Sequence, residues 1–336
     1  MAEPILEVRD LKVHFDTPDG VVKAVDGVSF AVAPGERLGV VGESGSGKSV
    51  SFLTVMGLIT RRYAKIEGEV LFRGRDLLGM SADEMRSIRG KGMAMVFQDP
   101  LSSLHPLYRV GGQIVEAVLA HEDMPKKQAW DLAVDMLRRV GISRPDERAR
   151  QYPHEFSGGM RQRAMIAMAL VLNPDVLIAD EPTTALDVTV QAQILDLIDR
   201  LRQEFRTAVI LITHDLGVVA EHTDRVQVMY AGKVVERGNR DHIYYESLHP
   251  YTWGLLQSIS HIDRKQDRLR PIKGSPPSLI FVPPGCAFHP RCPYVMDVCK
   301  QQVPDLLEED YGHASACHLS REDKRKIFSV EVQGQR

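Results

Sequence analysis

The amino-acid sequence predicts an α/β fold followed by a C-terminal segment of different character. Short apolar runs, which are typical of buried parallel strands, alternate with amphipathic helical patterns over about the first 240 residues. One of these strands leads into a glycine-rich loop that is followed by a helical pattern. Residues 271–293 instead contain seven prolines, which exclude a regular helix there. We therefore expect an α/β domain over residues 1–240 and an extension over residues 241–336.

The individual elements of the first part follow from hydrophobic periodicity. The strands that we expect are Leu6–Phe15, Val21–Val32, Arg37–Val41, Met93–Phe97, Val176–Ala179 and Ala208–Thr213. Two of the expected helices are Ser49–Leu58 and Arg161–Leu172. A third begins at Pro125, and its buried face consists of Ala129, Leu132, Ala133, Met136, Leu137 and Val140. A fourth has a buried face of Val190, Ile194, Leu197, Ile198 and Leu201.

Composition and charge exclude several classes of protein. The 42 basic residues and 45 acidic residues give a net charge of −3, with no basic stripe of the kind that nucleic-acid binding requires. The longest apolar run, Ala164–Leu172, has nine residues, whereas a membrane span needs about 20. The first residues are acidic and polar and lack the pattern of a signal peptide. We expect a chain that neither spans a membrane nor is secreted.

The sequence GESGSGKS at residues 42–49 predicts a phosphate-binding loop between a strand and a helix. Glycines allow successive backbone N–H groups to face a phosphate, and the helix N-terminus adds partial positive charge. In this pattern the lysine reaches the β- and γ-phosphates and the last hydroxyl binds Mg²⁺. The candidate nucleotide-binding residues are Gly42, Ser44, Gly45, Ser46, Gly47, Lys48 and Ser49.

Two further motifs contain side chains suited to phosphate chemistry. The apolar run that starts at Val176 ends in Asp180 and Glu181, of which the first is placed to hold the Mg²⁺ shell and the second to polarise an attacking water. In the sequence FSGGM, Ser157 is a good N-cap, but Gly158 and Gly159 weaken the helix that follows. Glycines at this point indicate a second helix terminus that a phosphate approaches closely.

Taken in order, the motifs GESGSGKS, VFQDP, FSGGM, LIADEP, TTALD and LITHD resemble those of the ATP-binding-cassette (ABC) ATPases over residues 5–240. This resemblance implies a cassette with a P-loop core, an antiparallel β subdomain and a helical subdomain at about residues 99–172. It implies that Gln98 lies near Mg²⁺ and the water, that His214 contacts the γ-phosphate and that Ala185-Leu-Asp187 is the D-loop. It also implies that Phe15 stacks on adenine.

The same resemblance implies a head-to-tail pair of cassettes. Each ATP would then lie between the glycine-rich loop of one chain and the FSGGM motif of the other, and this chain has one copy of each. Its signature differs from the commoner LSGGQ at Phe156 and Met160. The serine and glycines are unchanged, so we expect an active motif.

In the C-terminal sequence, His249-Pro-Tyr-Thr-Trp253 is followed by GSPPSLIFVPPGCAFHPRCPYVMDVCKQQVP. This sequence resembles the extension found in the D-type ATPase subunits of oligopeptide and dipeptide importers. The resemblance implies a second ATPase subunit, two transmembrane permease subunits, an extracytoplasmic peptide-binding protein as an indirect partner, and a place on the cytoplasmic face of the cell membrane. Glutathione, nickel complexes and antimicrobial peptides are alternative cargoes. A cassette ATPase acting on nucleic acid is disfavoured, because only 109 residues separate Lys48 from Ser157 and they contain no coiled-coil heptads.

All four cysteines, Cys286, Cys292, Cys299 and Cys317, fall within the extension. Their spacing lacks the close pairs of a zinc knuckle, whereas four thiolates meet the requirement of an iron–sulphur cluster. The family resemblance also implies a [4Fe-4S] cluster here, so we expect one. Zinc, with help from His289, His313 or His318, and four unmetallated thiols remain alternatives.

Overall fold

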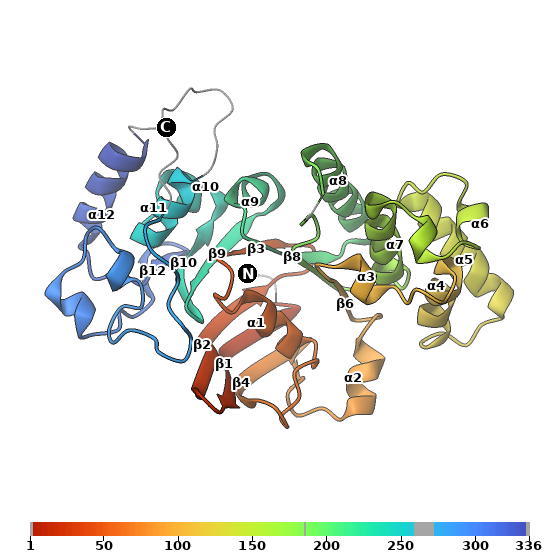
Figure 1. Cartoon of the computed structure of the whole chain (residues 1–336), viewed down its shortest axis with the longest axis horizontal. Helices are drawn as coiled ribbons and strands as arrows, with labels where there is room; N and C mark the ends of the chain where they lie inside the picture. The colour runs from red at the N-terminus through yellow and green to blue at the C-terminus, as the bar shows by residue number, and fades with distance from the viewer. Residues whose placement is uncertain (1–2, 185, 259–271, 334–336) are drawn as a thin grey trace. The chain divides into compact units, whose positions relative to one another are not determined.

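A computed structural model describes residues 3–184, 186–258 and 272–333. The chain divides into two compact units, each made of several segments. The first unit contains Met1–Leu6, Val32–Glu36 and Phe72–Leu211, and the second contains Glu7–Ala31, Arg37–Leu71 and Ile212–Arg336. Figure 1 labels elements of both units where there is room.

The strands of the first unit are short and buried. Strand β6 (Met93–Val96) pairs in parallel with β7 (Val176–Asp180), with Met93 opposite Val176. Every residue of these two strands is buried, as their continuous apolar sequence predicts. The other strands are β5 (Arg75–Asp76) and β8 (Ala208–Thr213), and β8 carries the chain into the second unit at Ile212.

Most of the first unit is helical. Its helices are α2 (Ala82–Ile88), α3 (Pro100–Ser103), α4 (Val110–Leu119), α5 (Lys126–Arg139), α6 (Pro145–Arg148), α7 (Gly158–Leu170) and α8 (Val188–Phe205), with a 3-10 turn at Pro153–Glu155. Helices α4, α5 and α7 pack against one another (Figure 1, yellow to green). Helix α5 follows Pro125 as expected, but Leu132 is 44% exposed, so its predicted burial was wrong. The five other apolar positions of that helical pattern are buried.

The second unit contains a sheet in which the extension continues the preceding part of the chain. Strand β3 (Arg37–Val41) runs parallel to β9 (Arg225–Tyr230), which pairs antiparallel with β10 (Lys233–Asn239). The extension then adds β12 (His313–Ser315) to β10 and β11 (Leu307–Asp310) to β12. Most of a second sheet, with the order β2-β1-β4, comes from β1 (Leu6–Thr17), β2 (Gly20–Val32) and β4 (Lys65–Phe72).

Helices of the second unit lie mainly in the extension. They are α1 (Lys48–Val55), α9 (Leu216–His222), α10 (Arg240–Tyr245), α11 (Pro250–Gln257) and α12 (Arg321–Ile327), with single turns at His289–Arg291 and Asp297–Lys300 and a π-helical segment at Phe328–Gln333. Residues 272–293 are otherwise irregular, as their prolines predict, and Pro271 lies outside the described residues. Within the described ranges, no helix is both long and apolar enough to cross a bilayer.

The extension is held to the preceding strands by a shared apolar core. Tyr230 of β9 is buried with Tyr251, Trp253, Phe288 and Phe328 of the extension. The ring centroids of Tyr230 and Tyr251 are 4.6 Å apart, and Phe288 packs edge-on against both rings. Burial of aromatic side chains on this scale accounts for the ordered packing of a segment with little regular structure.

Candidate nucleotide-binding site

The loop Gly42–Ser49 connects β3 to α1 in the second unit. Its three glycines have positive φ angles, 154° at Gly42, 78° at Gly45 and 97° at Gly47. A Cβ atom at Gly42 would lie 2.2 Å from the carbonyl oxygen of Met229, and one at Gly47 would lie 2.2 Å from that of Ala24. The conformation of this loop therefore requires glycine at Gly42 and Gly47.

Lys48 holds the loop in its curled form. Its ammonium group donates to the carbonyl oxygens of Gly42, at 2.6 Å, and Glu43, at 3.1 Å, and the residue is 5% exposed. Ser46 and Gly47 are also buried, whereas Ser44 and Gly45 are exposed. A buried ammonium beside a glycine-rich turn and the N-terminus of α1 fits a bound polyphosphate, and Ser49 lies in the first turn of this helix.

Two other predicted residues lie in the second unit. His214 is exposed at the end of β8, directly before Asp215, which caps α9 by accepting a hydrogen bond from the Gly217 N–H at 2.7 Å. Phe15 is half-buried on β1. Their roles toward a nucleotide stay predictions.

The first unit brings the predicted catalytic carboxylate and glutamine together. The side-chain amide of Gln98 donates to Glu181 Oε2 at 3.0 Å, and the hydroxyl of Thr184 donates to the same oxygen at 2.9 Å. Glu181 has a φ of 46°, a strained value for a residue with a side chain. Asp180 ends β7 and is 7% exposed. Thr184 belongs to the TTALD motif, but the sequence predicts no role of its own for this residue.

The FSGGM motif caps α7 in the first unit. Ser157 Oγ accepts a hydrogen bond from the Met160 N–H at 3.3 Å, and Ser157 and Gly158 are exposed. Neither glycine of the motif has a positive φ. A Cβ atom at Gly158 would meet its nearest neighbour, Leu186, at 3.9 Å, which is ordinary contact. The fold of this chain therefore does not itself require glycine at Gly158.

The D-loop lies beside this motif. Asp187 caps α8 by accepting a hydrogen bond from the Val190 N–H at 2.9 Å. A Cβ atom at Gly159 would lie 3.2 Å from a methyl group of Val190. The predicted residues Ser157, Gly158, Gly159 and Asp187 are thus neighbours, and Ala185 lies outside the described residues.

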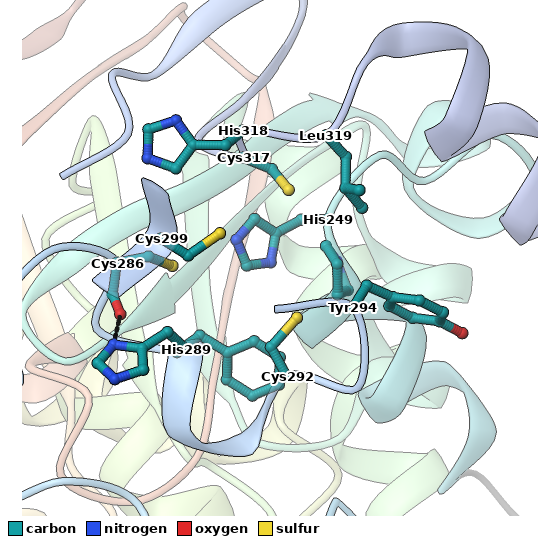
Figure 2. Close-up of a pocket in the computed structure, with 11 residues that line it drawn as sticks. His249, Cys286, His289, Cys292, Tyr294, Cys299, Cys317, His318 and Leu319 are labelled. Carbon is teal, nitrogen blue, oxygen red and sulfur yellow. Dashed lines mark hydrogen bonds between the residues drawn. The ribbon is translucent and has the colours of Figure 1, made fainter. Parts of the chain in front are cut away.

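The four cysteines line one small cavity in the second unit (Figure 2), around His249 and Phe288. This convergence is consistent with their clustering in the sequence. The prediction of a [4Fe-4S] cluster was nevertheless wrong. Among the described residues, no group of three or more histidine, cysteine, aspartate or glutamate side chains is suited to hold a metal ion.

The surroundings of the thiols affect their protonation when no metal is bound. Burial raises the pKa of Cys286, and it raises the pKa of Cys292 to about 12 and that of Cys317 to about 11. Neutral thiols behave as small apolar groups, whereas thiolates bind metals. The same absence of a metal-binding group overturns the zinc alternative, and His313 is paired with Glu236, 2.9 Å away. The third alternative, four unmetallated thiols, stays a prediction.

Comparison with family models assigns two stretches of the chain. Residues 25–184 match the ABC transporter family, and residues 235–299 match the C-terminal region of oligopeptide/dipeptide transporters. The chain is 51% identical over 329 residues to the dipeptide transport ATP-binding protein DppD of Bacillus subtilis, covering 98% of both chains. It is 48% identical over 316 residues to the oligopeptide transport ATP-binding protein OppD of Escherichia coli, covering 94% of this chain and 93% of that protein.

Solved structures show the same cassette fold. The ATP-binding cassette MJ0796, solved as a dimer in a post-hydrolysis state with ADP and Pi, is 26% identical, with a TM-score of 0.63 over 70% of this chain and 98% of that one. CbiO1 of Clostridium perfringens, part of the ABC transporter complex cbiONQ, is 28% identical, with a TM-score of 0.62 over 73% of this chain and 92% of that one. These similarities confirm the predicted fold class and ATPase activity, and the chain belongs to the ATP-binding subunits of the oligopeptide/dipeptide ABC transporter family.

Proposed function

We propose that this chain hydrolyses ATP to drive the import of dipeptides or oligopeptides. The observation that carries the proposal is the 51% identity over 98% of the chain to a dipeptide transport ATP-binding protein. It is supported by the match of residues 235–299 to the C-terminal region of oligopeptide/dipeptide transporters, since this region lies outside the ATPase motifs.

The roles of the residues follow from their chemistry. The backbone N–H groups of residues 42–49 and the Lys48 ammonium bind the phosphates, and Phe15 stacks on the adenine. Ser49, Asp180 and Gln98 would hold Mg²⁺, which would neutralise charge that develops on the phosphates. Glu181 polarises the attacking water, and His214 contacts the γ-phosphate. The hydrogen bond from Gln98 to Glu181 supports a shared role for these two side chains.

The second half of each composite site comes from a partner cassette. Ser157, Gly158 and Gly159 of one chain face the γ-phosphate bound by the other, and Asp187 lies at the same contact. The exposure of Ser157 and Gly158, and the dimeric form of a structurally similar cassette, support this arrangement. The partner is a second ATP-binding subunit, either a paralogue or another copy of this chain.

Two transmembrane permease subunits dock on the first unit, at the cytoplasmic face of the membrane. Leu101, Leu107 and Tyr108 expose 57%, 76% and 61% of their surface after strand β6. Beside them a groove is lined by His105, Tyr108, Gln113, Glu116, Ala117, Ala120 and Met168. Exposed apolar side chains around a groove indicate a contact surface for another protein. An extracytoplasmic binding protein delivers the cargo, so this chain itself needs no peptide pocket.

The test is reconstitution of the transporter. The tagged chain is purified from membranes with its associated subunits, inserted into liposomes with the binding protein, and assayed for ATP hydrolysis with dipeptides, longer peptides, glutathione or nickel complexes. We expect peptides to stimulate hydrolysis severalfold, and Glu181→Gln to abolish turnover while ATP binding persists. Isolation without permease subunits, or stimulation by a cargo other than peptides, would overturn the proposal.

A further inference from the structure

Glu43, the second residue of the phosphate-binding loop, is held by two residues of the C-terminal extension. Arg291 forms two hydrogen bonds with the Glu43 carboxylate, at 2.6 Å and 2.9 Å. The hydroxyl of Tyr251 accepts a hydrogen bond from the Glu43 N–H at 2.8 Å. These residues lie 248 and 208 positions away from Glu43 in the sequence, and all three belong to the second unit.

The contacts from Arg291 are built into the core rather than formed on the surface. The Arg291 side chain is 5% exposed and that of Glu43 is 27% exposed. The guanidinium lies 5.9 Å from the ring centroid of Tyr230 and 6.0 Å from that of Phe288, and its Nε donates to the Lys273 carbonyl at 3.1 Å. A two-point pair that is buried and backed by aromatic rings has a fixed geometry, unlike an exposed pair.

Tyr251 contributes an equally fixed contact. Its side chain is fully buried, and burial raises the pKa of its hydroxyl, which stays neutral at physiological pH. The Lys48 ammonium donates to the carbonyl oxygens of Gly42 and Glu43. The peptide segment at Gly42 and Glu43 is thus held at three points. Lys48 contacts its carbonyl oxygens, Tyr251 contacts the Glu43 N–H, and Arg291 contacts the Glu43 side chain.

The charge of Glu43 makes this clamp important for a polyphosphate ligand. A carboxylate in a phosphate-binding loop repels phosphates unless a cation neutralises it, and partial burial strengthens the repulsion. We propose that the extension is a working part of the nucleotide site, in which Arg291 and Tyr251 are positioning residues that fix the phosphate-binding loop and neutralise Glu43. This inference rests on the role proposed above for residues 42–49 in binding ATP.

The test is equilibrium binding of Mg-ATP to the full chain in a set of variants. Arg291→Met keeps the length of the side chain and removes its charge, so we expect about tenfold weaker binding. Adding Glu43→Gln to that variant removes the unpaired charge and should restore the affinity to within about threefold of the parent. Tyr251→Phe removes only the hydroxyl and should weaken binding about threefold.

The matched control is Lys324→Met. Lys324 forms another buried ion pair of the extension, with Glu309, and their side chains are 2% and 13% exposed. This variant should lower the melting temperature but leave ATP affinity within twofold. The proposal is overturned if Arg291→Met binds ATP normally, if Glu43→Gln fails to restore binding, or if Lys324→Met loses as much affinity. Because the assay needs neither permease nor peptide, its outcome is independent of whether peptides are the cargo.

Discussion

The two glycine-containing loops of this chain differ in what makes glycine necessary. In the loop at residues 42–49 all three glycines have positive φ angles, and Gly42 and Gly47 leave no space for a Cβ atom. In the FSGGM motif neither glycine has a positive φ, and Gly158 has ordinary space around it. The chain's own fold requires the first set, whereas the contacts of Gly158 within the chain do not require glycine.

The loops also differ in how they are supported. Residues 42–49 are held by the distant C-terminal extension, through Tyr251 and Arg291. Ser157 instead caps its own helix and is exposed. The phosphate-binding loop is thus fixed by contacts within the chain, whereas the FSGGM motif is accessible on the surface. Substitutions in the two loops should therefore be detected in different assays.

The largest effect is expected for Gly42→Ala. A side chain at this φ costs about 1–3 kcal/mol, and its Cβ would also collide with the carbonyl of Met229. We expect a melting temperature at least about 5 °C lower and ATP binding weakened more than about tenfold. Gly45→Ala is the control, because that position has a positive φ but open space. Equal losses in both variants would show that the collision is unimportant.

Ser157→Arg should leave ATP binding by the isolated chain nearly unchanged and should strongly reduce hydrolysis by the assembled transporter. The change removes the cap that Ser157 Oγ provides to α7, which costs about 0.5–2 kcal/mol, so the melting temperature of the isolated chain should fall by a few degrees. Its ATP affinity should change less than about twofold, because Ser157 is exposed. In the transporter we expect hydrolysis to fall at least about tenfold, because the arginine blocks the partner's phosphate from the motif. A large loss of affinity in the isolated chain would show that the motif serves its own nucleotide.

Gly158→Ala should stabilise the isolated chain and slow hydrolysis by the assembled transporter. Its effect on hydrolysis should be smaller than that of Ser157→Arg. Alanine fits the local space and reduces the freedom of the unfolded chain, so the isolated protein should be stabilised by about 0.4–1 kcal/mol. Hydrolysis by the assembled transporter should fall a few fold, because the added methyl group lies where the partner's phosphate approaches. Unfolding in urea measures the stability of the isolated chain, and steady-state assays measure hydrolysis by the transporter. Unchanged hydrolysis would show that the approach of the partner's phosphate does not require glycine at this position.

Local sequence patterns are sufficient to predict much of the chain. Strand β3 has the predicted bounds, Arg37–Val41, and β7 ends one residue beyond its predicted end, at Asp180. Short buried strands and a glycine-rich turn depend on neighbouring residues, so periodicity and residue type are enough to locate them. The motif residues at 42–49 are identifiable for the same reason.

Long-range contacts carry no local signal. The pairing of Glu236 with Ser315, which joins the extension to β10, and the pair of Arg291 with Glu43 depend on how distant segments pack. For Leu132 the sequence predicts burial that the structure does not show. Its position in the helical period indicates a buried side chain, but no neighbour covers it fully. The cysteine spacing indicated a cluster because sequence alone shows how close the thiols are in the chain, and not whether their side chains form a group that is suited to hold a metal ion.

The remaining effect is that of acid, which should act on the support of the first loop. His249 caps α11 through Nδ1, which accepts the Tyr251 N–H at 3.1 Å, and burial lowers its pKa to about 4. The negative charge of Glu236 partly opposes this lowering of the His249 pKa, and the positive charge of Lys324 adds to it. Between about pH 6.5 and pH 4 the unfolded chain binds a proton at this histidine that the folded chain does not, so stability is complete above pH 6.5 and falls as the pH drops.

The loss through His249 is at most about 3 kcal/mol, and urea unfolding at several values between pH 7 and pH 4.5 measures it. His249→Asn keeps a capping oxygen but does not titrate, so its stability should depend less steeply on pH even if it is lower at pH 7. His242, whose pKa is also lowered by burial, contributes equally to both proteins. Parallel pH curves for the two proteins would show that His249 is not the sensitive group. A flatter curve for the variant would place the acid-sensitive step at His249, two residues from Tyr251, whose hydroxyl contacts the phosphate-binding loop.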